Sequence, residues 1–174
     1  MKRNIIVCGL ISGAILTAMM VTSTAYCYKN ENFEGNMVVG YAVMILAFSL
    51  IFVGVKNYRD KYNNGIVSFG EAFKIGAYIT LIGSTMYVVV WLFEYYLFIP
   101  DFMEVYSAHV INQAKASGET TAEISSKTEE MATYKEMYKN PLFVVLLTYA
   151  EVLPIGLIVS AISALILKKR LSDN

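Results

Sequence analysis

Residues 142–167 read LFVVLLTYAEVLPIGLIVSAISALIL, and this stretch sets the class of the protein. Its single charged side chain is Glu151, and the basic residues 168–170 (KKR) follow the stretch directly. A helix needs about 20 predominantly apolar residues to cross the hydrocarbon core of a bilayer. The stretch therefore predicts a membrane-spanning helix that ends in cations, where the dipole of a helix favours positive charge.

Three further apolar segments, at about residues 5–26, 37–55 and 73–98, have the same character. Charged residues make up 16% of the chain, against about 25% in an ordinary soluble domain, and they gather between the apolar segments. Such segregation indicates lipid as the solvent, because a charge in hydrocarbon is costly. We expect one all-α membrane domain over residues 1–174, with four transmembrane helices.

The first apolar segment allows two interpretations. Its end, residues 22–25 (TSTA), is small and resembles a signal-peptide cleavage site. The apolar run is longer than the roughly 7–15 residues of a signal-peptide core. We therefore expect a retained helix, and a cleaved signal peptide is the alternative.

Helix-start signals precede the third and fourth spans. Ser68 and Glu71 are spaced as in a capping box, in which each side chain accepts a hydrogen bond from the other residue's free backbone N–H. Pro141 stands at a first helical position, where its missing N–H costs nothing. Residues 63–65 (NNG) are a turn signal before the third span.

The polar residues at about 100–140 carry a helical pattern rather than the composition of a disordered linker. Thr120 and Glu123 form a second capping box after the break at Ser117 and Gly118. We expect an extracytoplasmic helical hairpin between the third and fourth spans. A stripe of apolar residues at helical spacing either packs the hairpin helices together or forms a face for a partner protein, and it consists of Ile124, Met131, Tyr134 and Tyr138.

The distribution of basic residues predicts the orientation. Short loops rich in Lys and Arg stay in the cytoplasm. The side that holds both termini and residues 56–74 carries Lys2, Arg3, Lys56, Arg59, Lys61, Lys74, Lys168, Lys169 and Arg170. The other side carries acids such as Glu31 and Glu34, and its lysines are diluted in the long loop. We expect cytoplasmic N- and C-termini.

Five short motifs run in order along nearly the whole chain: residues 54–61 (GVKNYRDK), 68–76 (SFGEAFKIG), 100–103 (PDFM), 138–143 (YKNPLF) and 151–157 (EVLPIGL). With these motifs the chain resembles the DUF4199 family of bacterial membrane proteins. The resemblance implies a Bacteroidetes-type bacterium, an inner membrane and a periplasmic hairpin. Because the function of that family is unknown, the resemblance implies no activity and no functional residues.

Two acids, Glu94 and Glu151, fall inside apolar spans. Acids at such positions often mark proton or ion paths, but Glu94 can also extend to the outer interface, and Glu151 can be a structural acid that is hydrogen-bonded to a Tyr or Ser. Their depths differ by roughly 7 Å along the helices, which argues against a shared site. Pro154 removes a backbone hydrogen bond one turn after Glu151 and produces either a static kink or a hinge.

Small residues recur four apart on three of the spans, which lets helix backbones approach closely. They either pack the spans within one chain or form a homodimer seam, and they are Gly9 and Gly13, Gly76, Thr80 and Ser84, and Gly156, Ser160 and Ala164.

Motifs of enzymes are missing from the sequence. It has one histidine, His109, and its two cysteines, Cys8 and Cys27, would lie roughly 28 Å apart on one helix, too far to form a disulfide. No phosphate-binding glycine loop, HExxH or GxSxG occurs. We expect no catalytic residue, no cofactor, no metal and no nucleic-acid partner.

These observations favour a non-enzymatic scaffold or accessory subunit that presents the hairpin to a periplasmic or membrane protein. The alternative is a small proton- or ion-coupled transporter that uses Glu151. Besides the lipid bilayer, a homo-oligomer is an expected partner, because four helices alone make a narrow pathway.

Overall fold

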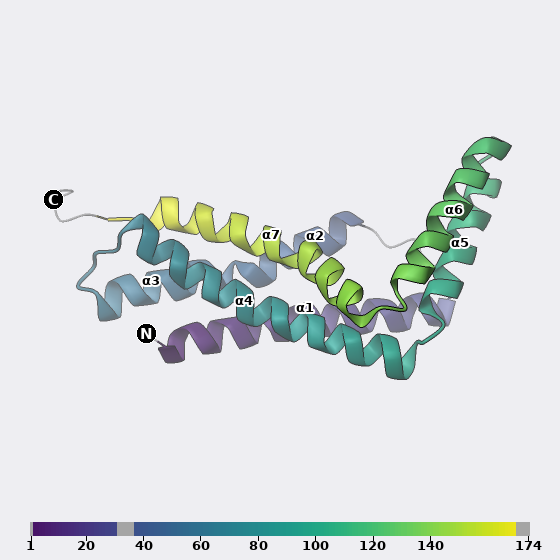
Figure 1. Ribbon diagram of the computed structural model, residues 1–174. Coiled ribbons are helices and arrows are strands. Elements are labelled where there is room, and N and C mark those ends of the chain that lie inside the picture. The colour runs from purple at the N-terminus through teal and green to yellow at the C-terminus, as the bar shows by residue number, and fades with distance from the viewer. Residues whose placement is uncertain (1, 31–36, 170–174) are drawn as a thin grey trace.

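The computed structural model describes residues 2–30 and 37–169, and this part of the chain is almost entirely helical (Figure 1). Residues Glu31, Glu34 and Arg170, which contribute to the predicted orientation, lie outside the described residues. The elements are α1 (Lys2–Asn30), α2 (Met37–Phe48), α3 (Leu50–Tyr62), α4 (Phe69–Phe93), the π-helical turn η1 (Glu94–Phe98), α5 (Phe102–Ala116), α6 (Thr121–Met137) and α7 (Pro141–Leu167).

Four helical segments of the described chain are long and apolar enough to cross a membrane. They are Lys2–Lys29, Val38–Tyr62, Phe69–Phe98 and Pro141–Leu167. The prediction of an all-α chain with four helices able to span a membrane is therefore confirmed.

The second span is longer than its apolar pattern. It runs to Tyr62 rather than to residue 55, so the charged residues that we expected in a loop form the last turns of α3. The reason is that an apolar pattern marks only the part of a helix that lies in hydrocarbon, whereas Arg59 and Lys61 suit the C-terminal end of a helix dipole. Ser49 interrupts the span only locally, and its hydroxyl donates to the Leu46 carbonyl at 2.6 Å.

The predicted helix starts are confirmed. The Glu71 amide donates to the Ser68 hydroxyl oxygen at 3.3 Å, and the Ser68 amide donates to the Glu71 carboxylate at 3.0 Å. Helix α7 begins at Pro141, and the side chain of Asn140 accepts a hydrogen bond from the Leu142 amide at 3.0 Å.

Helix α4 is the centre of the bundle and packs most extensively against α7 and α1. A Cβ added at Gly76 would lie 2.7 Å from the Cβ of Ser160 on α7, and one at Gly9 would lie 2.7 Å from the Cβ of Ile82. The hydroxyls of Thr80 and Ser160 share a buried hydrogen bond of 3.3 Å across the same contact. These small residues thus bring spans of one chain together.

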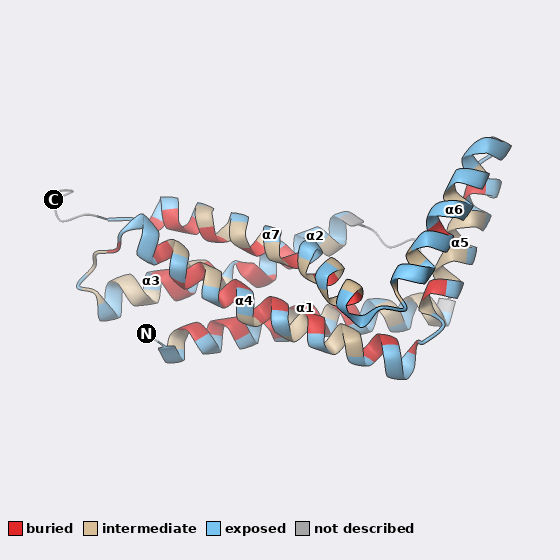
Figure 2. Ribbon diagram, in the orientation of Figure 1, coloured by how far each residue is buried: buried red, intermediate tan, exposed pale blue. Residues whose placement is uncertain are grey.

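Burial follows the contacts between spans. Figure 2 shows the buried residues where the helices face one another. Phe48, Ile51 and Ile79 are fully buried and belong to the hydrophobic core. The outer surface of the spans exposes large apolar side chains such as Leu46 and Leu146. An apolar outer surface is what a chain surrounded by lipid requires.

The end of the bundle that holds the N-terminus is closed by the loop before α4. Val67 and Lys169 exchange two backbone hydrogen bonds, of 3.1 and 2.9 Å, which tie this loop to the residues after α7. Asn64 and Gly65 turn the chain with positive φ values of 52° and 79°, which Asn and Gly tolerate best.

Helices α5 and α6 lie side by side at the other end and cross the direction of the spans (Figure 1). We call them the helix pair. Met103, Ala114 and Met131 are buried, and Lys135 of α6 forms an ion pair with Glu104 of α5 at 2.6 Å. This ion pair holds the pKa of the Glu104 carboxyl below its usual range, first through the hydrogen bond and then through the charge of Lys135.

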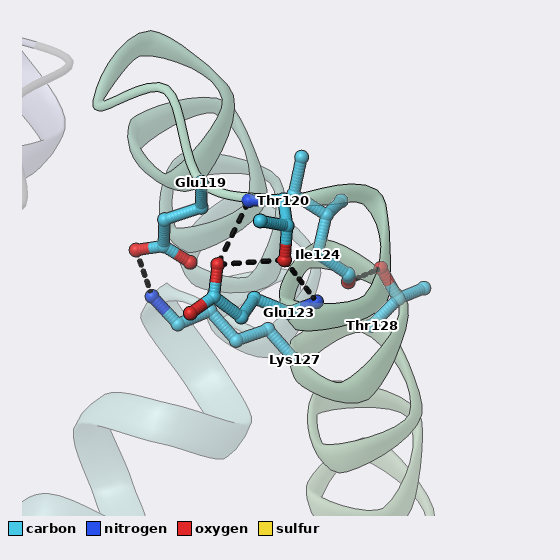
Figure 3. A network of polar contacts seen from close by, with 6 residues as sticks. All are labelled: Glu119, Thr120, Glu123, Ile124, Lys127 and Thr128. Carbon is cyan, nitrogen blue, oxygen red and sulfur yellow. Dashed lines mark hydrogen bonds and ion pairs between the residues drawn. The ribbon is translucent and has the colours of Figure 1, made fainter.

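Figure 3 shows the start of α6, where the second predicted capping box is formed. The Thr120 amide donates to the Glu123 carboxylate at 2.8 Å, and the Glu123 amide donates to the Thr120 hydroxyl at 3.3 Å. Lys127 adds an ion pair to Glu119 at 2.5 Å. The backbone N–H of Thr120, and after it the Thr120 hydroxyl, lower the pKa of the Glu123 carboxyl.

We expect Thr120→Ala to loosen the first turn of α6 by about 1 kcal/mol, the usual cost of losing an N-cap hydroxyl. Because the pKa of Glu123 is lowered in the folded state, its stabilising contribution is present above the unfolded carboxyl pKa of about 4.3 and is lost as the pH falls through the folded value. Carboxyl NMR titration should show the Glu123 pKa rising part of the way to normal in the variant.

Thr128→Ala is the matched control, since the Thr128 hydroxyl donates within the helix to the Ile124 carbonyl. Amide hydrogen exchange of residues 121–124 at neutral pH should accelerate in Thr120→Ala alone. Equal acceleration in both variants would contradict the capping role.

Candidate functional site

A cavity of about 730 Å³ lies between the helix pair and the spans α4 and α7. We call it the aromatic cavity. It takes side chains from all four helices, and two of its lining residues, Glu130 and Glu151, carry carboxylates. Its aromatic lining consists of Tyr87 and Trp91 from α4, Phe102 and Tyr106 from α5, and Tyr134 and Tyr138 from α6 and its C-terminal end.

Ring contacts fix the helix pair against the spans. Trp91 meets Phe102 edge to face, with ring centroids 5.2 Å apart, and so joins α4 to α5. Tyr95 of η1 meets Tyr138 at 5.5 Å, which joins the third span to the end of α6. Aromatic pairs in this range add attraction beyond their buried area. Contacts between these helices therefore hold the wall of the cavity in place.

Glu151 of α7 lines this cavity together with Thr148 and Ala150 of the same helix, and it is an exposed residue. Among the described residues its carboxylate forms no hydrogen bond to a Tyr or Ser, and no Lys, Arg or His lines the cavity. Glu130 enters the same cavity from α6. Two carboxylates therefore face one space without a basic residue in its described wall.

Tyr138 lies beside this acidic group. Burial, and then the negative charge of Glu151, raise the pKa of Tyr138 to about 12. The phenol is therefore protonated at neutral pH and is available as a hydrogen-bond donor at the cavity wall.

Glu94 lies in a different place. It sits on η1 with 9% of its surface exposed, in a second cavity of about 320 Å³ that Thr24 and Tyr28 of α1 also line. One of its carboxylate oxygens, Oε2, is buried without a hydrogen-bond partner among the described residues. Glu94 thus lies beside α1, and because Glu94 and Glu151 line different cavities, the two acids do not share a site. An extension of Glu94 to the outer interface stays a prediction.

Only some of the other predicted site residues line the aromatic cavity. Met131, Tyr134 and Tyr138 line the aromatic cavity, whereas Ile124 is half-buried nearer the start of α6 and does not. Pro154 lies within α7, exposed on its surface and outside the cavity lining. The use of the stripe by a partner protein, and a hinge at Pro154, stay predictions.

A family model described as "Protein of unknown function (DUF4199)" matches residues 8–169. The chain belongs to the DUF4199 family. No curated protein and no solved structure matches it. Two of the motifs that carried the resemblance, at residues 100–103 and 138–143, supply Phe102, Met103 and Tyr138 to the wall of the cavity in this DUF4199 protein.

Sequence reasoning missed the α4 side of the site. Tyr87, Trp91 and Tyr95 are spaced four apart. Tyr87 and Trp91 of α4 line the cavity, and Tyr95 of η1 packs against Tyr138. Inside an apolar span, this row reads as ordinary membrane-facing surface. The sequence pattern also gave no reason to single out Glu130, because it stands next to Glu129 in a polar helix. The row of aromatic residues at helical spacing was the one signal for this wall.

Proposed function

We propose that this DUF4199 protein is a non-enzymatic membrane protein that binds an amphiphilic small molecule in the aromatic cavity. The observation that carries the proposal is the composition of that cavity, in which apolar and aromatic side chains from two spans and the helix pair surround two carboxylates, Glu151 of α7 and Glu130 of α6. Its volume of about 730 Å³ falls within the roughly 300–1,000 Å³ of small-molecule sites.

The test is native mass spectrometry of the full chain released from mild detergent. Ala150→Trp places a large side chain in the cavity, whereas Ala14→Trp places the same side chain on the exposed surface of α1. We expect wild type and Ala14→Trp to retain a bound amphiphile, and Ala150→Trp to lose it. Equal retention in all three proteins, or retention in none, would count against binding in the cavity.

The proposal includes an orientation in a bacterial inner membrane, with both termini in the cytoplasm and the helix pair in the periplasm. Its support is that the basic ends of α1, α3 and α7 lie at one end of the bundle and the helix pair at the other (Figure 1).

We expect a cysteine at Ser117, between the helices of the pair, to react with a membrane-impermeant maleimide in cells whose outer membrane is permeable. A cysteine at Lys61, near the end of α3, should react only after the inner membrane is opened. Both labels are made in a background of Cys8→Ser and Cys27→Ser, because both native cysteines are free thiols. The reverse labelling pattern would invert the orientation.

Proton- or ion-coupled transport is the second candidate function, and the position of Glu151 in the cavity favours it. In proteoliposomes, Glu151→Gln should abolish coupled flux and leave the fold intact. Unchanged flux in this variant would remove Glu151 from any transport step.

Presentation of the helix pair to a partner protein is the third candidate. Deletion of residues 111–137 should then abolish partner capture while the spans still insert. A homo-oligomer also stays a prediction, because the small residues on α1, α4 and α7 are engaged within one chain.

A further inference from the structure

Among the described residues, the charged side chains that line the aromatic cavity are all acidic. Glu130 and Glu151 contribute carboxylates from two different helices, α6 and α7. Neither carboxylate has a hydrogen bond or an ion pair within the described part of the chain. Two lysines of this region, Lys135 and Lys139, are held by ion pairs of 2.6 Å with acids outside the cavity lining, Glu104 and Glu136.

The uncharged lining is suited to a cation as well. An organic cation is attracted to the face of an aromatic ring when it lies within about 6 Å of the ring centre, and Trp is the strongest partner. Trp91 and Phe102 form a corner of the cavity, and Tyr106 stacks on Phe102 with ring centroids 5.7 Å apart. The described wall thus offers carboxylates and ring faces to one ligand.

We propose that the ligand of the aromatic cavity is a lipophilic organic cation, whose ammonium or comparable charged group pairs with Glu151 and Glu130 and whose apolar body contacts the rings. The inference rests on the proposed binding function and adds the charge of the ligand. A hydrogen bond between an ammonium group and a carboxylate is roughly twice as strong as one between neutral groups, so the two exposed carboxylates favour a cationic ligand over a neutral one.

The ligand carries a net positive charge rather than a zwitterionic head group. A phosphate would need Lys, Arg or several N–H donors, and no basic side chain lines the cavity among the described residues. Phosphate oxygens would also lie close to two carboxylates. Phosphatidylethanolamine, which contains both an ammonium and a phosphate, is therefore expected to bind poorly.

The experiment uses the single tryptophan of the chain, Trp91, which lines the cavity. The full-length protein in uncharged dodecyl maltoside is titrated with N-decylpyridinium, a cation that quenches tryptophan fluorescence at short range. Decyltrimethylammonium, decyl sulfate and phosphatidylethanolamine then serve as competitors. We expect saturable quenching that decyltrimethylammonium relieves and that the other two do not.

Charge-neutral variants locate the effect. Loss of one charge-assisted contact should raise the apparent Kd for N-decylpyridinium about tenfold in Glu151→Gln, and a rise is also expected in Glu130→Gln. Glu129→Gln removes the same charge from the neighbouring exposed residue, which does not line the cavity, and should leave the Kd unchanged. Retained helix content and thermal midpoint show that each variant is folded.

The outcomes separate the two proposals. Saturable quenching that decyl sulfate relieves as well as decyltrimethylammonium does, with no effect of Glu151→Gln, would overturn the cation inference and leave amphiphile binding in place. Efficient competition by phosphatidylethanolamine would overturn the net positive charge. Absence of saturable quenching in the wild-type protein would overturn both proposals.

Discussion

Phe48→Ala is expected to destabilise the folded bundle by about 3 kcal/mol, near the lower end of measured losses for buried Phe→Ala changes. Phe48 ends α2 and is fully buried, and its ring lies against the backbone of Gly83 on α4, 3.5 Å from where a Cβ would stand. Lipid is as apolar as the core, so the loss is mainly of packing contacts.

The neighbouring contact gives the reason that α2 would loosen as a unit. The carbonyl of Ala47 accepts a buried hydrogen bond from the Ser12 hydroxyl of α1 at 2.8 Å. The end of α2 is thus attached to α1 by this bond and to α4 by the ring of Phe48. The measurement is reversible unfolding in mixed micelles with increasing dodecyl sulfate.

Phe98→Ala is the matched control, because 78% of Phe98 is exposed. We expect this variant to unfold within about 0.5 kcal/mol of wild type, as is usual for surface substitutions. A loss in Phe98→Ala as large as that in Phe48→Ala would show that the packing against Gly83 is not what stabilises this part of the bundle.

Gly156→Val is expected to lower the stability by about 2 kcal/mol, the middle of the range for overpacked cores. A Cβ at this position would lie 2.7 Å from the Oγ1 of Thr80 on α4. Thr80 is fully buried and β-branched, so its side chain cannot rotate away cheaply. Its movement would also break the hydrogen bond to Ser160.

Gly40→Val tests whether this effect comes from the contact or from the loss of a helical glycine. Gly40 lies in the span that contains α2, and a Cβ there meets nothing within 4 Å. We expect near-wild-type thermal unfolding for Gly40→Val and a clear decrease for Gly156→Val. Equal decreases would contradict a close approach of α4 and α7 at Gly156.

The spans and the helix starts could be predicted because their physical causes are local. The apolar runs mark the hydrocarbon-embedded parts of the helices, and the capping boxes at Ser68 and Thr120 need only residues three apart. The extension of α3 to Tyr62 was missed, since a helix that continues beyond lipid has no reason to stay apolar.

The candidate site could be predicted only in pieces. The charge of Glu151 in an apolar span predicts an intramembrane polar site. The place of Tyr134 in the apolar stripe predicts either packing within the hairpin or a face for a partner protein. The two residues meet in one cavity because the helix pair lies across the bundle end next to α7 (Figure 1). That angle depends on contacts such as Trp91 with Phe102, which sequence spacing does not encode.

The measurement that tests occupation of the aromatic cavity most directly is photo-crosslinking in growing cells. p-Benzoylphenylalanine replaces Tyr134, which lines the cavity, or the adjacent Thr133, which is exposed and does not. After irradiation, intact-protein mass spectrometry should reveal a small-molecule adduct on the chain labelled at position 134 and none at position 133. Absence of an adduct at 134, or equal adducts at both positions, would contradict binding of an amphiphile in the cavity.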